Sequence, residues 1–222
     1  MTGPVAVTRD GDVTVLRMTT EEGRFNPAMI SAINTALDEV EASSSPAAVV
    51  LTGDGKFFSN GLDLEWMSSA PDKDADGLLH SVHELFARVL VFPTPTVAAV
   101  NGHAFAAGAM LAMAFDSRVM REDRGFFCVP EADLGLPFTP EMTALLRATL
   151  PVTTAREAMF TGRRYGARDA VAAGIVDAAV AQDELLASSV ARAAAQADKP
   201  RSTLREIKRA FFSEALAVLP PI

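Results

Sequence analysis

Two loops of small residues and one carboxylate in apolar company are the parts of this sequence that could do chemistry. Residues 53–64 (GDGKFFSNGLDL) and 101–110 (NGHAFAAGAM) each follow a short apolar run. Small residues at the start of a helix let an anionic oxygen approach N–H groups that have no partner within the helix. Two such loops could supply paired N–H donors for a developing enolate. Tight packing of a helix on a sheet also favours Gly and Ala, so residues 101–110 alone leave both interpretations open.

The candidate base is Glu131, which directly follows the apolar residues 126–130 (FFCVP). Burial disfavours the charged form of a carboxylate and raises its pKa, which makes it a stronger base and then a usable acid. Two N–H donors and one half-desolvated carboxylate would form a proton-transfer site. The alternative is a structural glutamate that caps a turn or pairs with Arg118 or Arg124, since most glutamates lie at the surface.

The order of these segments resembles the crotonase superfamily, the enoyl-CoA hydratase and isomerase family of acyl-CoA enzymes, from about residue 48 to residue 177. Residues 56–63 (KFFSNGLD) match its first oxyanion motif, which implies that Leu62 provides one N–H donor. Residues 101–108 match the second motif, which implies that Ala107 provides the other. Residues 130–135 match the segment that carries the catalytic glutamate. The resemblance also implies contacts with substrate or coenzyme A at Lys56, Phe58, Asn60, Gly61, Leu62, Asp63, Leu64 and Met110.

One departure from the family pattern decides the expected reaction. Hydratases of this family carry a second glutamate on the helix after the small-residue triplet, and Met110 stands at that position here. Water addition is commonly shared between two carboxylates, and a thioether cannot deprotonate water. The resemblance therefore favours the Δ3,Δ2-enoyl-CoA isomerase branch of fatty-acid β-oxidation, with Glu131 as the proton shuttle. An enoyl-CoA hydratase that uses Glu141 or Asp133 as its second carboxylate remains an alternative, as does a non-catalytic acyl-CoA-binding homologue.

Composition limits the other classes of function. Of the 222 residues, 49% are hydrophobic, which is enough for a sizeable core. The net charge of −8 argues against nucleic-acid binding, which favours a basic surface. One cysteine, Cys128, excludes an intramolecular disulfide, and its apolar neighbours indicate an inert buried thiol. His80 and His83 do not have the spacing of a metal pair, and both are expected to face solvent. We predict no metal and no bound cofactor, with coenzyme A only as part of the substrate.

The N-terminal residues lack a signal peptide, and the apolar stretch 97–115 is interrupted by the polar residues 101–103. The sequence therefore predicts no membrane span and, by default, a cytoplasmic protein. In the resembled family, trimers and pairs of trimers are usual, so the resemblance implies a homotrimer or hexamer.

The elements that must position these residues follow an α/β pattern. A hairpin is expected over residues 5–18, buried strands over 48–52 and 96–100, and a helix after Gly102 that ends near Phe115. A first helix should start near residues 26–27, carry an apolar stripe and end at residues 43–46, which are Ser and Pro. Asp63 should cap the helix that follows it.

The remaining segments complete a crotonase-type ββα spiral with C-terminal helices. Residues 70–77 are polar and are expected to be mobile, at the edge of the acyl pocket. We predict that residues 1–180 form the spiral core with the coenzyme A and acyl site. Residues 181–222 should form a helical segment that packs on this core or on a neighbouring subunit. Its apolar positions are Leu185, Val190 and Ala194, then Ile207, Phe211 and Leu216.

Overall fold

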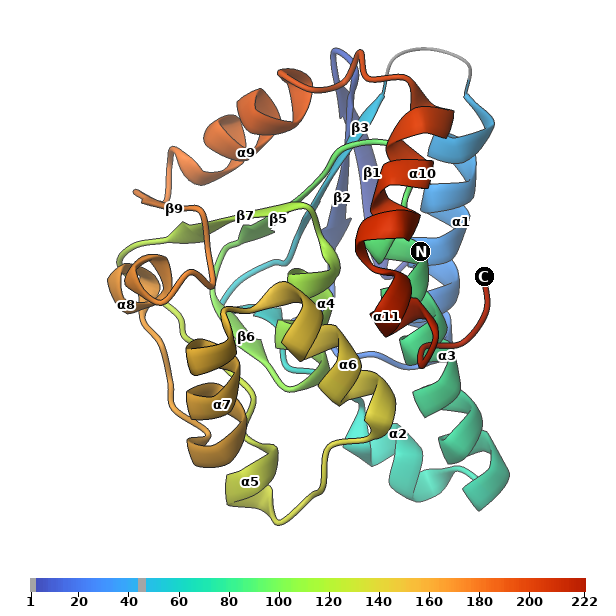
Figure 1. The fold of residues 1–222 in the computed structure, drawn as a ribbon, viewed down its shortest axis with the longest axis vertical. Helices are drawn as coiled ribbons and strands as arrows, with labels where there is room; N and C mark the ends of the chain where they lie inside the picture. The colour runs from blue at the N-terminus through green and yellow to red at the C-terminus, as the bar shows by residue number, and fades with distance from the viewer. Residues whose placement is uncertain (1–2, 44–46) are drawn as a thin grey trace.

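A twisted six-stranded sheet organises the chain in the computed structural model, which describes residues 3–43 and 47–222 (Figure 1). Its strand order is β1-β2-β3-β5-β7-β9; β1 runs antiparallel to β2, and the other neighbours are parallel. The strands are β1 (Val5–Asp10), β2 (Val13–Met18), β3 (Ala48–Thr52), β5 (Thr96–Val100), β7 (Ser117–Arg121) and β9 (Ala178–Val180). The predicted hairpin and both predicted buried strands are therefore confirmed.

A second, smaller sheet carries the segments of chemical interest. It consists of β4 (Phe57–Ser59), β6 (His103–Phe105) and β8 (Phe127–Cys128), all parallel and in the order β4-β6-β8. The chain enters it three times, each time directly after a strand of the large sheet, and each time continues into a helix. This repeated strand–strand–helix path is the α/β organisation that the sequence predicts.

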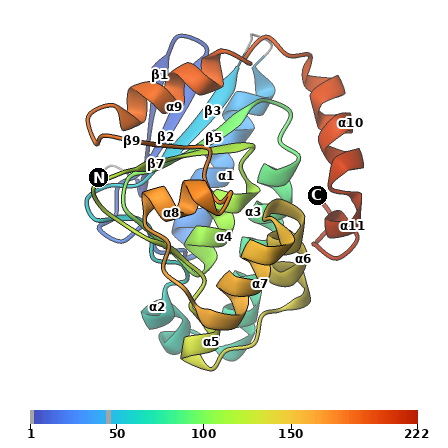
Figure 2. The same ribbon diagram turned by 60° about the vertical axis from the view of Figure 1, so that its left-hand side comes forward.

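Helices cover both faces of the large sheet, and Figures 1 and 2 show α9 across one face with α1, α3 and α4 on the other. Alternate side chains of β3 serve the two faces: Val49 and Leu51 pack with the α1, α3 and α4 side, and Ala48 and Val50 with the α9 side. A strand buried on both faces needs this continuous apolar run. The helices are α1 (Pro27–Ala42), α2 (Leu64–Ser69), α3 (Asp72–Leu90), α4 (Ala107–Ala114), α5 (Glu131–Leu134), α6 (Pro140–Thr149), α7 (Val152–Thr161), α8 (Ala167–Ala172), α9 (Leu185–Ala194), α10 (Arg201–Phe211) and α11 (Ser213–Leu216).

Helix α1 forms as its sequence predicts. The Asn26 side chain accepts a hydrogen bond from the Met29 N–H, and Pro27 occupies the first helical position, where its missing N–H costs nothing. The apolar stripe is buried, and each such side chain contributes roughly 2 kcal/mol. Of the predicted stop signal, residues 44–46 lie outside the described residues.

Two local predictions are wrong, and residues 72–77 prove helical, while their expected mobility stays a prediction. Residues 103–105 form β6 before the helix α4 begins, because the His103 N–H donates to the Lys56 carbonyl and joins the small sheet. Residues 72–77 belong to α3, whose first turn is closed by hydrogen bonds from the Asp74 and Ala75 N–H groups to the Pro71 carbonyl. His83 is only 4% exposed, because it lies on the face of α3 that packs against α6.

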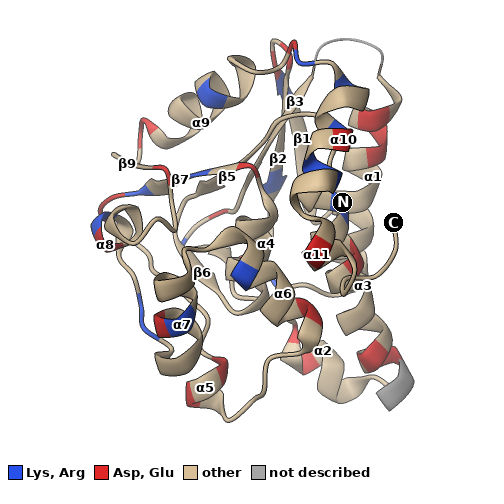
Figure 3. Cartoon of the chain, viewed as in Figure 1, with Lys and Arg blue, Asp and Glu red and all other residues tan. Residues whose placement is uncertain are grey.

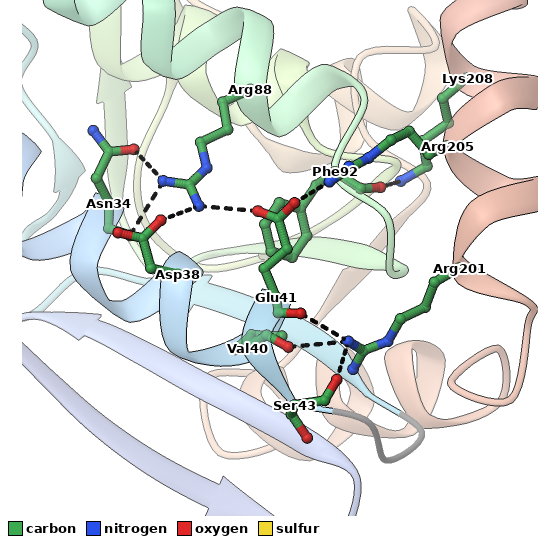
Figure 4. A network of polar contacts seen from close by, with 10 residues as sticks. All are labelled: Asn34, Asp38, Val40, Glu41, Ser43, Arg88, Phe92, Arg201, Arg205 and Lys208. Carbon is green, nitrogen blue, oxygen red and sulfur yellow. Dashed lines mark hydrogen bonds and ion pairs between the residues drawn. The ribbon is translucent and has the colours of Figure 1, made fainter. Parts of the chain in front are cut away.

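Helix α10 is attached to the rest of the molecule by charged side chains (Figure 4). The Arg201 guanidinium donates to the carbonyl oxygens of Val40 and Glu41 at the C-terminal end of α1, where the helix dipole favours a cation. Arg205 pairs with the Glu41 carboxylate, which also accepts a hydrogen bond from Arg88 of α3. These contacts hold α10 against α1 and α3.

A buried lysine makes the third attachment of α10. The Lys208 ammonium donates to the Phe92 carbonyl at 2.9 Å, to the Thr94 carbonyl at 3.1 Å and to the Asp116 carboxylate at 2.7 Å. Burial lowers the pKa of Lys208, and Asp116 opposes that shift. All three ammonium donors can therefore be satisfied inside the protein.

Of the apolar positions predicted to pack on the core or on a neighbouring subunit, the two on α10 do not face the core. Ile207 is 60% exposed and Phe211 is 76% exposed, whereas Leu216 of α11 is partly buried. Among residues 3–43 and 47–222, no helix has both the length and the apolar character that a membrane crossing requires.

Candidate active site

The first candidate donor loop follows β4 and is held in place by the segment before α1. The Phe25 N–H donates to the Gly61 carbonyl at 2.8 Å, and the Asp63 N–H donates to the Phe25 carbonyl at 2.9 Å. Gly61 has a φ of +84°, which permits the turn between these contacts. Leu62 lies between the two fixed peptides, and its own N–H donates no hydrogen bond within the described part of the chain.

Polar side chains fix the loop on both sides of Leu62. The Asp63 carboxylate accepts from the Trp66 N–H at 3.1 Å and caps α2, as predicted, and it also accepts from the Asn26 side chain. The Asn60 amide donates to the Glu22 carboxylate at 2.8 Å. Both side chains therefore hold the backbone in place.

The second candidate donor, the Ala107 N–H, lies where β6 ends and α4 begins. The Ala106 N–H donates to the Cys128 carbonyl at 3.0 Å and continues the small sheet, and Ala107 then opens the helix. In the described residues, the Ala107 N–H makes no intramolecular hydrogen bond. Every residue of α4 is buried, and Figure 3 shows no charged residue on it. The positive end of its dipole is therefore set in apolar surroundings.

Two glycines bring these loops into backbone contact. A methyl group added to Gly108 would lie 2.4 Å from the Ser59 carbonyl oxygen, and one added to Gly61 would lie 3.2 Å from the Ala107 nitrogen. No side chain fits at Gly108, so only glycine lets β4 and α4 pack this closely. The structure thus joins the loops of Leu62 and Ala107 into one site.

The third segment leaves the small sheet at the same edge. Phe105 of β6 pairs with Cys128 of β8, so Ala107 and Glu131 follow neighbouring parallel strands by only two and three residues. Ser59 of β4 pairs with Ala104 on the other side of β6. Because parallel strands place their carboxyl ends at one edge, all three segments emerge together, and this edge is where α/β proteins commonly bind ligands.

Glu131 is buried, and part of its carboxylate has no partner. It is 6% exposed, and its Oε2 atom accepts no hydrogen bond. Burial raises the pKa of Glu131 to about 7, partly offset by a hydrogen bond from its own backbone N–H. Neither Arg118 nor Arg124 forms an ion pair with it in the described structure, and Arg118 instead pairs with Asp177. The alternative of a glutamate paired with either arginine is therefore wrong.

Other carboxylates are engaged elsewhere. Glu141 lies at the start of α6, with Oε2 3.9 Å from the His83 Nδ1 atom. Asp133 is exposed and lies against Gly162. Met110, at the position predicted to distinguish isomerases from hydratases, is fully buried in α4. The part of the chain that the structure describes has no cluster of three His, Cys, Asp or Glu side chains that could hold a metal ion.

The Cys128 thiol is buried, as predicted. Its sulfur donates to the Gly162 carbonyl at 3.2 Å, and burial raises its pKa to about 11. At neutral pH the thiol stays protonated and is a poor nucleophile.

The remaining predicted binding residues fall into different environments. Lys56 is exposed just before β4, and Leu64 is exposed at the start of α2. Phe58 is fully buried in the core, so only its backbone could meet a ligand. Their roles in binding stay predictions.

A groove beside the first loop contains Arg24 and Asn26, which the sequence-based prediction of the site missed. A cavity of about 450 Å³ is lined by Arg24, Asn26 and Asp63, among others. Arg24 pairs with Glu22 at 2.6 Å and is partly exposed. The bridge between Phe25 and Leu62 places this groove at the site, and two segments 37 residues apart give no sequence signal of that pairing.

Comparison with known proteins agrees with this architecture. Residues 11–220 match the enoyl-CoA hydratase/isomerase family. Enoyl-CoA delta isomerase 2, peroxisomal, from Arabidopsis thaliana is 40% identical over 182 residues, which cover 78% of this chain and 76% of that protein. A putative enoyl-CoA hydratase from Thermus thermophilus is 36% identical and covers 95% of this chain and 82% of its own length.

A solved structure gives the same result for the fold. A probable enoyl-CoA hydratase from Mycobacterium tuberculosis superposes with a TM-score of 0.91 at 27% identity, over 97% of this chain and 91% of that one. The crotonase-type α/β fold that the resemblance implies is therefore confirmed. The chain belongs to the enoyl-CoA hydratase/isomerase family of enzymes.

Proposed function

We propose that this protein is a Δ3,Δ2-enoyl-CoA isomerase of fatty-acid β-oxidation. The observation that carries the proposal is a single buried carboxylate, Glu131, with a pKa of about 7 at the edge where two unpaired backbone N–H groups emerge. Met110 fills the position of the second hydratase glutamate with a buried thioether. The 40% identity to an enoyl-CoA delta isomerase supports the same branch.

In the proposed reaction, the thioester oxygen of a 3-enoyl-CoA accepts hydrogen bonds from the Leu62 and Ala107 N–H groups. Ionised Glu131 removes a proton from C2, and the electron pair of the broken C–H bond delocalises into a dienolate whose charge the two donors stabilise. The protonated Glu131 then returns the proton to C4. The double bond moves from C3–C4 to C2–C3, and Glu131 is regenerated.

The apolar surroundings suit this proton shuttle. A carboxyl group with a pKa near the working pH can accept and return a proton with a small energetic cost in either direction. Buried Met110 offers no group to hold and deprotonate a water molecule. Exclusion of water protects the dienolate from side reactions.

The coenzyme A portion of the substrate is proposed to lie along the groove at Arg24 and Asn26, beside Leu62. Arg24 is the basic residue of this groove, where it pairs with Glu22 and lies near Asp63. It would have to meet the phosphates together with exposed Lys56 outside the groove. Coenzyme A enters with the substrate and is not a resident cofactor. We retain cytoplasmic residence as a prediction, although some relatives are named peroxisomal. We also propose a homotrimer or hexamer, in which exposed Ile207 and Phe211 could be covered.

The test is to incubate the protein separately with 3-hexenoyl-CoA and 2-hexenoyl-CoA in heavy water. Conjugation of the first substrate with deuterium uptake and no 3-hydroxyacyl product supports the isomerase. The Met110→Ala variant should keep substantial turnover, because the side chain takes no part in proton transfer. Loss of activity in Met110→Ala with full activity in Glu131→Gln would reverse the assignment.

The hydratase remains the second candidate because the Thermus relative named a putative enoyl-CoA hydratase covers 95% of the chain. Hydration of 2-hexenoyl-CoA at a rate that rivals isomerisation would favour it and would require Glu141 or Asp133 to hold water. Tight acyl-CoA binding without any deuterium uptake would instead favour a non-catalytic binding protein.

A further inference from the structure

Ala106 has an unusual backbone conformation at the junction of β6 and α4. Its φ is +48° and its ψ is −126°. Among residues 3–43 and 47–222, it is the one non-glycine residue with a positive φ. Glycine adopts this conformation freely, whereas a Cβ atom makes it strained. Strain of this kind persists only where the surrounding structure enforces it, and it concentrates at functional sites.

This conformation controls the direction of the Ala107 N–H, because that N–H belongs to the peptide between Ala106 and Ala107. With Ala106 in an ordinary extended conformation, where ψ is about +135°, the peptide plane would be turned by roughly 100°. The N–H would then point away from its present direction. The strained ψ of Ala106 therefore sets where the second donor points.

Contacts on three sides enforce the conformation. The Ala106 N–H donates to the Cys128 carbonyl, and the Ala106 carbonyl accepts from the Met110 N–H, each at 3.0 Å. The third contact is with the first donor loop, since a methyl group added to Gly61 would lie 3.1 Å from the Ala106 Cβ atom. The Ala106 methyl group thus lies over bare Gly61, immediately before Leu62.

We propose that Ala106 is a positioning residue that fixes both donors at once, through its ψ angle for Ala107 and through its methyl group for the loop of Leu62. The proposal rests on the isomerase function proposed above and refines its oxyanion hole. Glycine at this position would relieve the strain but would let the Ala106–Ala107 peptide rotate and remove the methyl contact with Gly61. Alanine at position 106 therefore makes the fold somewhat less stable but holds the two N–H donors in a preorganised geometry.

The Ala106→Gly variant separates these two effects. We expect kcat for 3-hexenoyl-CoA to fall about tenfold, less than the loss on removal of a whole donor, with KM changed by less than twofold. The midpoint of thermal unfolding should stay equal or rise, because strain is relieved. The matched control is Ala112→Gly, a buried position in the same helix with ordinary geometry. It should lower the midpoint, as glycine does inside helices, and leave kcat within twofold.

A second measurement does not depend on turnover. The carbonyl stretch of hexanoyl-CoA labelled with ¹³C at the thioester should shift to lower frequency on binding, and Ala106→Gly should lose a large part of that shift. If the wild type fails to isomerise but shows a frequency shift that depends on Ala106, the isomerase proposal fails and the positioning role stands. An unchanged carbonyl shift and an unchanged kcat in Ala106→Gly would overturn the positioning role.

Discussion

Helices α4 and α10 are held in the molecule by opposite means. Every residue of α4 is buried, and all its side chains are apolar. In α10 the buried residue is Lys208, and Arg201 and Arg205 also point at acceptors on α1 (Figure 4). Ile207 and Phe211 of the same helix are exposed. One helix is fixed by close packing and the other by directional charged contacts.

The two ways of attachment suit α4 and α10 to different roles. Close packing fixes α4 to within the tolerance that an oxyanion donor needs, since interiors behave like crystals of small molecules. The charged side chains of α10 make hydrogen bonds and ion pairs only where a carbonyl or carboxylate group lies within reach, as the carboxylates of Glu41 and Asp116 do. We therefore expect changes at the N-terminal junction of α4, where Ala106 and Ala107 lie, to affect chemistry and changes in α10 to affect stability.

The largest expected effect is on chemistry, from Glu131→Gln. The variant should lower kcat for 3-hexenoyl-CoA by about 10³-fold or more, at the upper end of general acid–base contributions, because one group performs both proton transfers. Its free energy of unfolding at pH 8 should not fall, because the amide removes a buried charge. The rise in absorbance of the conjugated thioester measures the rate.

Glu141→Gln is the matched control, since it removes a carboxylate at the start of α6 that pairs with His83 rather than with the proposed site. Its rate should stay within about threefold of the wild type. A Glu131→Gln variant that keeps a tenth of the activity, or a Glu141→Gln variant that loses it, would show that another base acts.

On the α10 side, Lys208→Ala should destabilise the fold without changing the chemistry. Loss of one partner of a buried ion pair costs about 3 kcal/mol or more. We expect about 2 to 3 kcal/mol here, because the Asp116 side chain is 32% exposed. Urea unfolding gives the change in free energy, and kcat per folded molecule should stay within twofold.

Lys199→Ala provides the comparison on the same region of the chain, because Lys199 is exposed and a surface substitution of this kind changes stability by less than about 0.5 kcal/mol. Equal losses in the two variants would mean that the buried contacts of Lys208 contribute nothing. A fall in kcat for Lys208→Ala would contradict the separation of the two regions.

The sequence predicts the α4 side of the molecule better than the α10 side. Buried strands such as residues 48–52 and the cap at Asp63 follow from apolar runs and local hydrogen bonding, and both are confirmed. The pattern Ile207, Phe211 and Leu216 instead predicts a stripe that packs on the core or on a neighbouring subunit. The core alternative is wrong for Ile207 and Phe211, because Lys208 and the arginines find acceptors that lie more than 90 residues away in sequence, which no local pattern contains.

Within the site, too, some features follow from local sequence and others do not. Glycine positions and the apolar residues before Glu131 predict the loops and the raised pKa, because both depend on local composition. Strand β6, the groove at Arg24 and the strained φ of Ala106 depend on pairings between strands and loops. Sequence reasoning therefore finds the reacting groups but misses part of what positions them.

Glu131 also couples the stability of the fold to pH, with a smaller effect than it has on kcat. Burial raises the pKa of Glu131 from 4.5 to about 7. Between these values the folded protein binds a proton that the unfolded chain has released, so the free energy of unfolding falls as pH rises through this window. Glu131→Gln lacks this titration, and its stability advantage over the wild type should grow between pH 4.5 and 7, by at most about 3 kcal/mol, and then level off.

Urea unfolding of the wild type and of Glu131→Gln at pH 5, 6, 7 and 8 measures that difference. The contributions of all other titrating groups are the same in both proteins and cancel in the difference. The kcat/KM of the wild type should rise over the same window, because only ionised Glu131 can remove the C2 proton. The ionised form that catalyses is thus the form that destabilises the fold. The Lys199→Ala variant keeps Glu131 and should show the same pH dependence as the wild type. A stability difference that is independent of pH would mean that Glu131 titrates near 4.5 and is not desolvated.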